Sequence, residues 1–180
     1  MFGEGKTHTK QLTTYILCDT LALMAIDLEN FDEVKLKGEE LYKSLIDVHC
    51  PFFNGKVYFN AQGLGHLKFK RHGHARPQQD QYMRFKLLHL APIILRNSKT
   101  LQGIWETKSF EKIRVHSRTD TVMKDVTYYE FVAVMENVRA KIIVKQVAGG
   151  QRVFWSIIPF WGIDKKTKKK KLHSVYPMED

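Results

Sequence analysis

A single stretch of twelve residues, residues 65–76, concentrates the side chains of this sequence that are best suited to chemistry. It contains His66, His72 and His74 together with Lys68, Lys70, Arg71 and Arg76. Histidine has an unperturbed pKa near neutrality, so its imidazole can take up or give a proton, while Lys and Arg can neutralise a phosphate. Three imidazoles among four cations therefore indicate cleavage of a phosphodiester.

Two other interpretations of this stretch stay open. His72 and His74 have the His-x-His spacing of some zinc and copper sites. However, the surrounding cations raise the cost of binding a dication and no carboxylate lies nearby, so we expect no metal. The stretch could also be a solvated basic loop with one histidine packed in the core.

Residues 139–145 provide a second source of positive charge. Apolar and charged residues alternate there, and a period of two places alternate side chains on opposite faces of a strand. One face then carries Arg139, Lys141, Ile143 and Lys145. In the following apolar segment Ser156 is the one small hydroxyl, and a buried hydroxyl needs a partner or a ligand.

The elements that must position these residues follow from hydrophobic periodicity. Helices are predicted at residues 8–28, 31–48, 62–71 and 78–96, and strands at 56–59, 101–107, 110–116, 127–135, 138–147 and 152–160. Helices followed by hairpin-linked strands indicate an α+β fold, with N-terminal helices packed on one face of a mostly antiparallel sheet of about four to five strands. The other face would be free to hold a ligand.

The sequence divides into three predicted parts. Residues 1–50 form a helical hairpin extension, residues 51–163 form the α+β domain, and residues 164–180 form a lysine-rich tail that we expect to be disordered. The formal net charge is +10, but six lysines lie at residues 165–171, which leaves about +4 for the rest. Outside its tail, the protein is therefore only moderately basic.

The compartment is inferred from the cysteines and from the apolar segments. Cys18 and Cys50 lie in apolar surroundings without CxxC spacing, as free thiols do in a reducing compartment. The most apolar segment, residues 12–26, is interrupted by polar residues and lacks the flanks of a signal peptide. We therefore expect a cytoplasmic protein that neither enters a membrane nor is secreted.

Taken together, residues 56–160 resemble the phage-type barnase/EndoU/colicin/RelE-like nuclease superfamily. The resemblance is carried by Gly65-His66-Leu67 with Arg71-His72, by the helix ending in residues 90–95, by the strands at 128–134 and 141–145, and by residues 154–159. It implies a metal-independent endoribonuclease without a cofactor. In such an enzyme a base activates the ribose 2′-hydroxyl for attack on phosphorus, an acid protonates the leaving oxygen and cations stabilise the oxyanions.

The resemblance also implies roles for individual residues. His66 or His72 would be the base or the acid, and Ser156 would orient the phosphate or the 2′-hydroxyl. Arg71 and Lys145 would bind phosphate, with Lys141 in the same RNA-binding set. The implied partners are RNA and, if the protein is a toxin of a phage or mobile element, a cognate inhibitor protein.

Two alternatives are not catalytic. In the first, the same basic sheet grips RNA or DNA and stacks bases on Tyr128, Tyr129 or Trp155 without cutting. Alanine at His66 or His72 should then cost little, whereas a nuclease should lose orders of magnitude in rate. In the second, a phage or mobile-element component uses its helical hairpin to bind another protein.

Deletion of the residues after Asp164 should weaken RNA binding and flatten its salt dependence without changing turnover at saturation. The reason is that each phosphate contact releases counterions and steepens the dependence of affinity on salt. The measurement is a titration of labelled RNA at several salt concentrations with the full chain and the deletion variant. An unchanged slope would mean that the lysines make no phosphate contacts.

Overall fold

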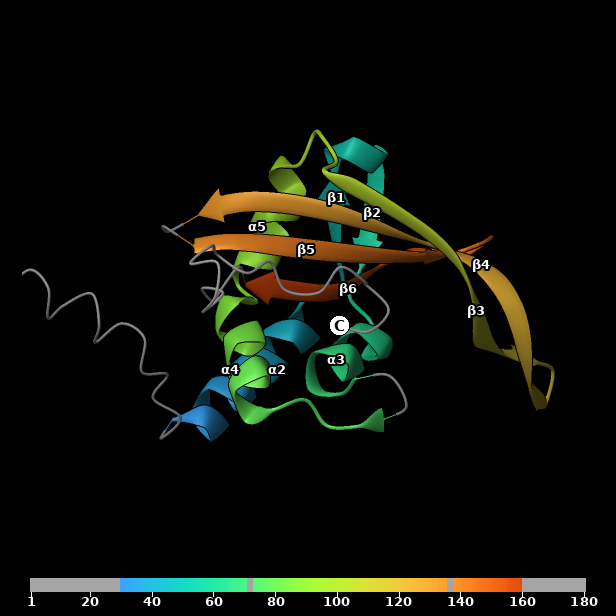
Figure 1. The fold of residues 1–180 in the computed structure, drawn as a ribbon, viewed down its shortest axis with the longest axis horizontal. Coiled ribbons are helices and arrows are strands. Elements are labelled where there is room, and N and C mark those ends of the chain that lie inside the picture. Colours follow the sequence, from blue (N-terminus) through green and yellow to red (C-terminus); the bar gives the residue numbers. More distant parts are fainter. Residues whose placement is uncertain (1–29, 71–72, 136–137, 160–180) are drawn as a thin grey trace, which may run out of the picture.

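The protein is described by a computed structural model that covers residues 30–70, 73–135 and 138–159. Its helices are α2 (Phe31–Ser44), the short 3-10 helix η1 (Pro51–Phe53), α3 (Ala61–Lys68), α4 (Gln78–Leu87) and α5 (Leu90–Asn97). Its strands are β1 (Asp47–Cys50), β2 (Gly55–Tyr58), β3 (Gly103–Val115), β4 (Arg118–Met135), β5 (Val138–Val147) and β6 (Arg152–Pro159). The α+β class is confirmed (Figure 1).

The strands form one sheet in the order β1-β2-β6-β5-β4-β3. All neighbours are antiparallel except β2 and β6, which are parallel and pair only at Tyr58 and Val153. The described sheet thus has six strands, slightly more than the four to five expected, because β1 joins β2 at one edge. The last described strand, β6, lies in the interior of the sheet.

The helices cover one face of this sheet, as expected from the sequence. Ile142 and Val144 of β5 point to that face and join Leu88, Leu95 and Phe154 in the main core. Their neighbours in the strand point to the opposite face, since side chains alternate along a strand. That second face carries a smaller cluster of Val126, Tyr128, Ile143 and Ile158, with Trp105, Val147 and Trp155 packed against it.

The predicted boundary at residue 50 does not separate two bodies in the structure. The Tyr42 ring of α2 packs edge-on against Phe59 at 5.5 Å and against Phe154 at 5.9 Å. The helix predicted over residues 31–48 ends at Ser44, because the following residues pair with β2 as strand β1. Residues 31–50 therefore belong to the same core as the sheet, while the helix predicted at 8–28 lies outside the described residues.

The single helix predicted over residues 78–96 is wrong, because the chain forms two helices there. Proline at position 92 has no amide hydrogen, and its ring would clash with the carbonyl four residues earlier, that of Leu88. The Leu88 carbonyl instead accepts from the Ala91 amide at 3.0 Å, and the chain turns between α4 and α5. The break lets α4 reach β6 while α5 packs on β1, β4 and β5.

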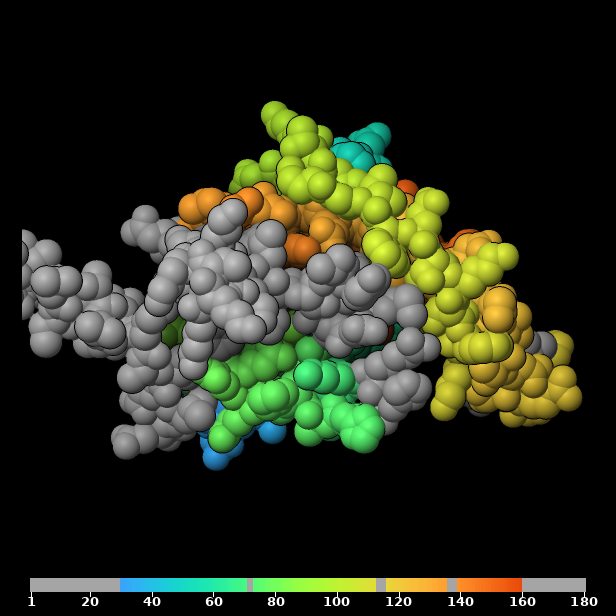
Figure 2. All heavy atoms as spheres, in the orientation of Figure 1, coloured from blue at the N-terminus to red at the C-terminus, as the bar shows by residue number. Residues whose placement is uncertain are grey.

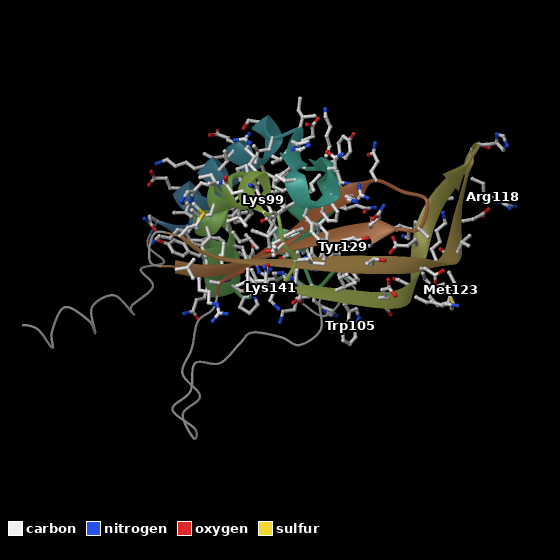
Figure 3. The ribbon with its side chains drawn as sticks, turned by 90° about the horizontal axis from the view of Figure 1, so that it is seen from above. Lys99, Trp105, Arg118, Met123, Tyr129 and Lys141 are labelled. Carbon is white, nitrogen blue, oxygen red and sulfur yellow. The ribbon has the colours of Figure 1, made fainter. Side chains whose placement is uncertain are left out.

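Strands β3 and β4 form a long hairpin that extends past the body of the molecule. The segments predicted at 101–107 and 110–116 are one continuous strand, paired with β4 from Gly103–Glu130 to Val115–Arg118. Figures 2 and 3 show this arm projecting from the body, with Met123 and Arg118 far from Tyr129 and Lys141. We call the part of this hairpin formed by residues 107–126 the β3–β4 arm. Among the described helices, none is long and apolar enough to span a membrane.

Two glycines of α3 should respond to alanine with opposite sign. A Cβ at Gly63 would collide with the Phe154 carbonyl and the Tyr42 hydroxyl, whereas a Cβ at Gly65 would meet nothing within 4 Å. Gly63→Ala should therefore destabilise the protein by about 1–3 kcal/mol, as overpacking does. Gly65→Ala should stabilise it by up to about 1 kcal/mol through helix propensity. Urea unfolding of both variants measures the two changes in the free energy of unfolding. Equal changes would contradict the close packing of α3 on β6 at Gly63.

Candidate functional site

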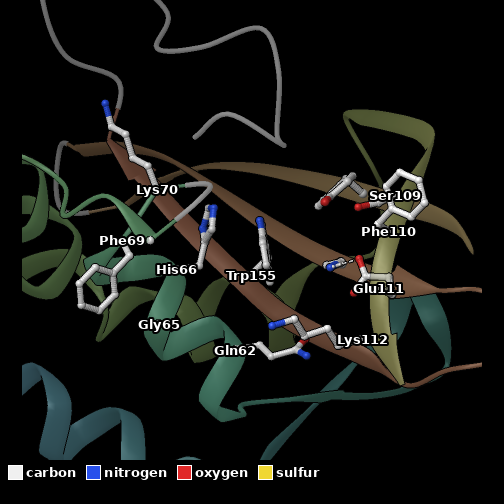
Figure 4. A pocket seen from close by; sticks show the side chains of 13 residues that line it. Gln62, Gly65, His66, Phe69, Lys70, Ser109, Phe110, Glu111, Lys112 and Trp155 are labelled. Carbon is white, nitrogen blue, oxygen red and sulfur yellow. Dashed lines mark hydrogen bonds and ion pairs between the residues drawn. The ribbon is translucent and has the colours of Figure 1, made fainter. Parts of the chain in front are cut away.

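An open cavity of about 770 Å³ lies between α3 and β3, on the side of β6 that carries Trp155 (Figure 4). Helix α3 is preceded by Asn60, whose side-chain oxygen accepts from the Gly63 amide at 3.1 Å and caps the helix. The cavity is lined by Gln62, Gly65, His66, Phe69, Lys70, Gly73, Ser109, Phe110, Glu111, Lys112, Tyr128, Lys145 and Trp155. Five elements and one loop thus contribute to its wall, far apart in the sequence.

A buried ion pair forms part of this wall. Lys145 is only 5% exposed, and its Nζ donates to Glu111 Oε1 at 2.7 Å. The same ammonium lies 4.5 Å from the centroid of the Trp155 ring, a cation–π arrangement. Burying a charge is costly unless it is paired and hydrogen-bonded, and Glu111 provides both for Lys145 at this wall.

His66 lies beside this pair as a neutral imidazole. Its ring stacks on Trp155 with centroids 4.2 Å apart and planes at 27°. Burial, with a smaller contribution from the positive charges of Arg76, Arg84 and Lys145, lowers the pKa of His66 to about 2. The imidazole is therefore unprotonated near neutral pH and has little affinity for a proton. This conflicts with the predicted role of His66 as base or acid in the free protein.

Behind His66, one carboxylate joins two buried arginines. Asp80 accepts from Arg76 at 3.2 Å and from Arg84 at 3.0 Å, and Arg76 also donates to the His66 carbonyl at 2.8 Å. Burial raises the pKa of Asp80, but the two guanidiniums outweigh it and hold that pKa below its usual value. Asp80 is thus ionised, and it fixes the loop after α3 to α4.

Ser156 belongs to this arginine network and not to the cavity wall. It is fully buried, and its hydroxyl accepts from Nη1 of Arg84, which also lies 3.4 Å from the Ile157 carbonyl. The pairing of β2 with β6 stops at Val153, so α3 and α4 cover the remaining edge of β6 and Arg84 supplies donors to it. The structure therefore does not support the predicted contact of the Ser156 hydroxyl with a phosphate.

The remaining predicted residues are distributed unevenly. Lys145 lines the cavity, but Lys141, four residues earlier on the same face of β5, pairs with Glu130 at 3.1 Å and does not line it. Arg71 and His72 lie outside the described residues. Of the six predicted site residues, the structure brings His66 and Lys145 together at one cavity.

The residue that the sequence analysis missed is Glu111. It lies 34 residues before Lys145, in a segment with no recognisable motif. The strand register places Lys145 opposite Tyr128 and Trp105, so the bend of the β3–β4 hairpin seen in Figure 1 brings Glu111 to Lys145. Tyr128 and Trp155 were considered only as stacking groups for a non-catalytic module, and both line the cavity. Lys70 and Lys112 add two exposed cations to the same lining.

Within the described residues, no three His, Cys, Asp or Glu side chains are grouped as a metal ion would require. Comparisons of the chain with protein-family models, with curated proteins and with solved structures found no match. The described residues form an α+β fold with an open cavity at the second face of the sheet, where His66, Glu111, Lys145 and Trp155 meet.

The buried neutral His66 should make the protein acid-sensitive. Its pKa in the unfolded chain is about 6.5, so below that pH the unfolded state binds a proton that the folded state does not bind. Stability contributed by His66 is present above pH 6.5 and is lost as the pH falls toward the folded value of about 2. Between pH 6.5 and pH 5 the loss is about 2 kcal/mol.

Urea unfolding at pH 7 and pH 5 measures this effect in the parent protein, in His66→Gln and in His74→Gln, whose histidine is exposed. His66→Gln should lose less stability than the parent between the two pH values, whatever its stability at pH 7. His74→Gln should behave as the parent does. The same pH dependence in all three would contradict a neutral His66.

Proposed function

We propose that this protein is an endoribonuclease that cuts RNA at the cavity by attack of a ribose 2′-hydroxyl, without a metal. The single observation that carries the proposal is the pairing of Glu111 with Lys145 in the wall of an open cavity, beside His66 and Trp155. A carboxylate can accept a proton and an adjacent ammonium can stabilise the charge that develops on a phosphate. Both groups are held in place before any substrate arrives.

In this proposal Glu111 is the general base. Its carboxylate removes the proton of the 2′-hydroxyl, the 2′-oxygen bonds to phosphorus, and the bond from phosphorus to the 5′-oxygen breaks. Lys145 stabilises the negative charge on the phosphate oxygens, and a water molecule in the open cavity protonates the leaving 5′-oxygen. The hydroxide that remains takes the proton from Glu111, which restores the carboxylate and the water. The products are a 2′,3′-cyclic phosphate and a 5′-hydroxyl.

His66 and the two rim lysines have supporting roles. Arg76 Nη2 lies 3.3 Å from Nε2 of His66 and an arginine can only donate, so the neutral imidazole accepts there and His66 supports the wall through its stack on Trp155. Lys70 and Lys112 are exposed at the cavity and attract the RNA backbone, which carries one negative charge per nucleotide. These assignments replace the acid or base role expected of His66 and the phosphate contact expected of Ser156.

Membership of the barnase/EndoU/colicin/RelE-like superfamily is part of the same proposal. What supports it is the order of elements, with helices α3, α4 and α5 before an antiparallel run of β3, β4, β5 and β6. A toxin-like role in a phage or mobile element, a cytoplasmic location and a cognate inhibitor protein are extensions of this proposal. They are proposed only because the nuclease activity is proposed.

A second candidate is a module that binds RNA without cutting it. The aromatic rings of Trp155, Tyr128 and Phe110 around the cavity favour it, since bases stack on such rings. The low proton affinity of His66 also favours it, because an imidazole that does not titrate near neutrality is a poor acid or base. In a binding module Lys145 would contact the RNA, whereas Glu111 would have no role as a base.

The deciding experiment is incubation of the full chain with total RNA in EDTA, with analysis of the ends. The parent should leave 2′,3′-cyclic phosphates, and Glu111→Gln should cut at least about a hundredfold more slowly, as expected when a general base is lost. Lys141→Gln, which changes a lysine of the same strand outside the cavity, should cut as the parent does.

Preparing all three proteins in parallel excludes a contaminating nuclease, because such an activity would be equal in each. RNA that is retarded on a gel but stays intact would favour the binding module. Cleavage by Glu111→Gln at the rate of the parent would remove Glu111 as the base.

A further inference from the structure

We infer that the protein forms a symmetric dimer in which strand β3 pairs antiparallel with β3 of a second copy, about a two-fold axis at Ser109. The partner that this edge of the sheet fits is therefore another copy of the same chain. The inference goes beyond the proposed nuclease activity and does not depend on it.

Strand β3 is an open edge of the sheet (Figure 3). It pairs with β4 along all of its 13 residues, and within the described ranges no strand lies on its other side. The main-chain N–H and C=O groups of a free edge can pair with another strand, which natural proteins often prevent with a proline, a bulge or a short edge strand. None of these devices is present, because β3 is long, contains no proline and pairs with β4 without a register shift.

The charges of β3 favour one register of this pairing. A two-fold axis perpendicular to the sheet sets side chains of the same face opposite each other. With the axis at Ser109, the middle residue of the strand, Gly103 pairs with Val115 of the second copy and the whole strand is used. Glu106 then lies opposite Lys112 of the second copy, and symmetry repeats this pair of opposite charges on the other side of the axis.

The two neighbouring registers lack this complementarity. An axis at Lys108 would set that lysine opposite its own copy, and an axis at Phe110 would set Lys108 opposite Lys112 of the second copy. Like charges directly opposite each other destabilise a sheet, whereas opposite charges stabilise it. Glu106 and Lys112 are both exposed, and neither has an ion-pair partner in the part of the chain that the structure describes. The same register therefore pairs the complete strand and matches its charges.

The pairing also covers exposed apolar surface on the β3–β4 arm. Phe110 is 67% exposed, and Met123, opposite it on β4, is 53% exposed. In the dimer Phe110 lies opposite Lys108 of the second copy and diagonally across from Phe110 of that copy. An aromatic ring can pack on the apolar stem of a lysine, attract its ammonium and reach a diagonal neighbour. The exposed ring thus gains contacts that a single copy does not provide.

This symmetry has a consequence for the cavity. Rotation about an axis perpendicular to a sheet does not exchange its faces, so both cavities of the dimer lie on the same side. Ser109 and Lys112, which line the cavity, belong to the strand at the junction. The two cavities are therefore next to the junction of the two copies.

Charge reversal tests the register, with sedimentation equilibrium of the full chain, freed of nucleic acid, as the measurement. The parent should be a dimer. Glu106→Lys and Lys112→Glu should each weaken it at least about tenfold, because symmetry places two pairs of like charges at the junction. The double variant should restore the dimer, since its charges are again opposite. Glu40→Lys, the same change at an exposed glutamate of α2, is the matched control and should associate as the parent does.

Cross-linking tests the position of the axis without changing a charge. A short bis-maleimide should join Ser109→Cys into a covalent dimer, with the parent giving the background from its own cysteines. Thr107→Cys should cross-link much less, because residue 107 and its copy are offset by about 13 Å along the strands. A parent that is monomeric at every concentration would overturn the inference. So would single reversals that associate as Glu40→Lys does, or equal cross-linking at residues 107 and 109.

Discussion

The arrangement around β6 depends on one carboxylate, that of Asp80. Arg76 and Arg84 are both buried, and Asp80 accepts a hydrogen bond from each. Removing one partner from a buried ion pair typically costs about 3–5 kcal/mol, because the remaining charge is left uncompensated. Through these guanidiniums the carboxylate ties together the carbonyl of His66 in α3 and the hydroxyl of Ser156 in β6. The stack of His66 on Trp155, and with it one wall of the cavity, follows from that connection.

The parts of the fold that local pattern determines could be predicted from the sequence. The α+β class, strand β5 over residues 138–147 and the turn at Asn54, whose φ is 43°, follow from periodicity and turn chemistry. Pro92 also indicated a break between α4 and α5. However, the helical periodicity on both sides of it favoured a single helix. Strand β1 could not be predicted, because its residues continue the helical spacing of α2 and form a strand only by pairing with β2.

The candidate site shows where sequence reasoning stops. The alternation of β5 predicted both Lys141 and Lys145 on one cationic face, without distinguishing them. In the structure Glu130 pairs with Lys141, whereas Glu111 pairs with Lys145 at the wall of the cavity. Ser156 was correctly singled out as a buried hydroxyl that needs a partner. The partner is an arginine from α4, and no spacing along the chain could have identified it.

The place of β6 within the sheet has a consequence for the order in which the protein can assemble during synthesis. The hairpin of β1 and β2 is made early, but it connects to the rest of the sheet only through β6, which is the last described strand to leave the ribosome. Long-range pairing of this kind is slow, because closing a long loop costs conformational entropy before the new contacts stabilise the chain. Trp155, one wall of the cavity, arrives in that same final strand. A chain still attached to the ribosome short of residue 159 therefore has no finished cavity, and whatever the cavity binds can be bound only after the last described strand has been made.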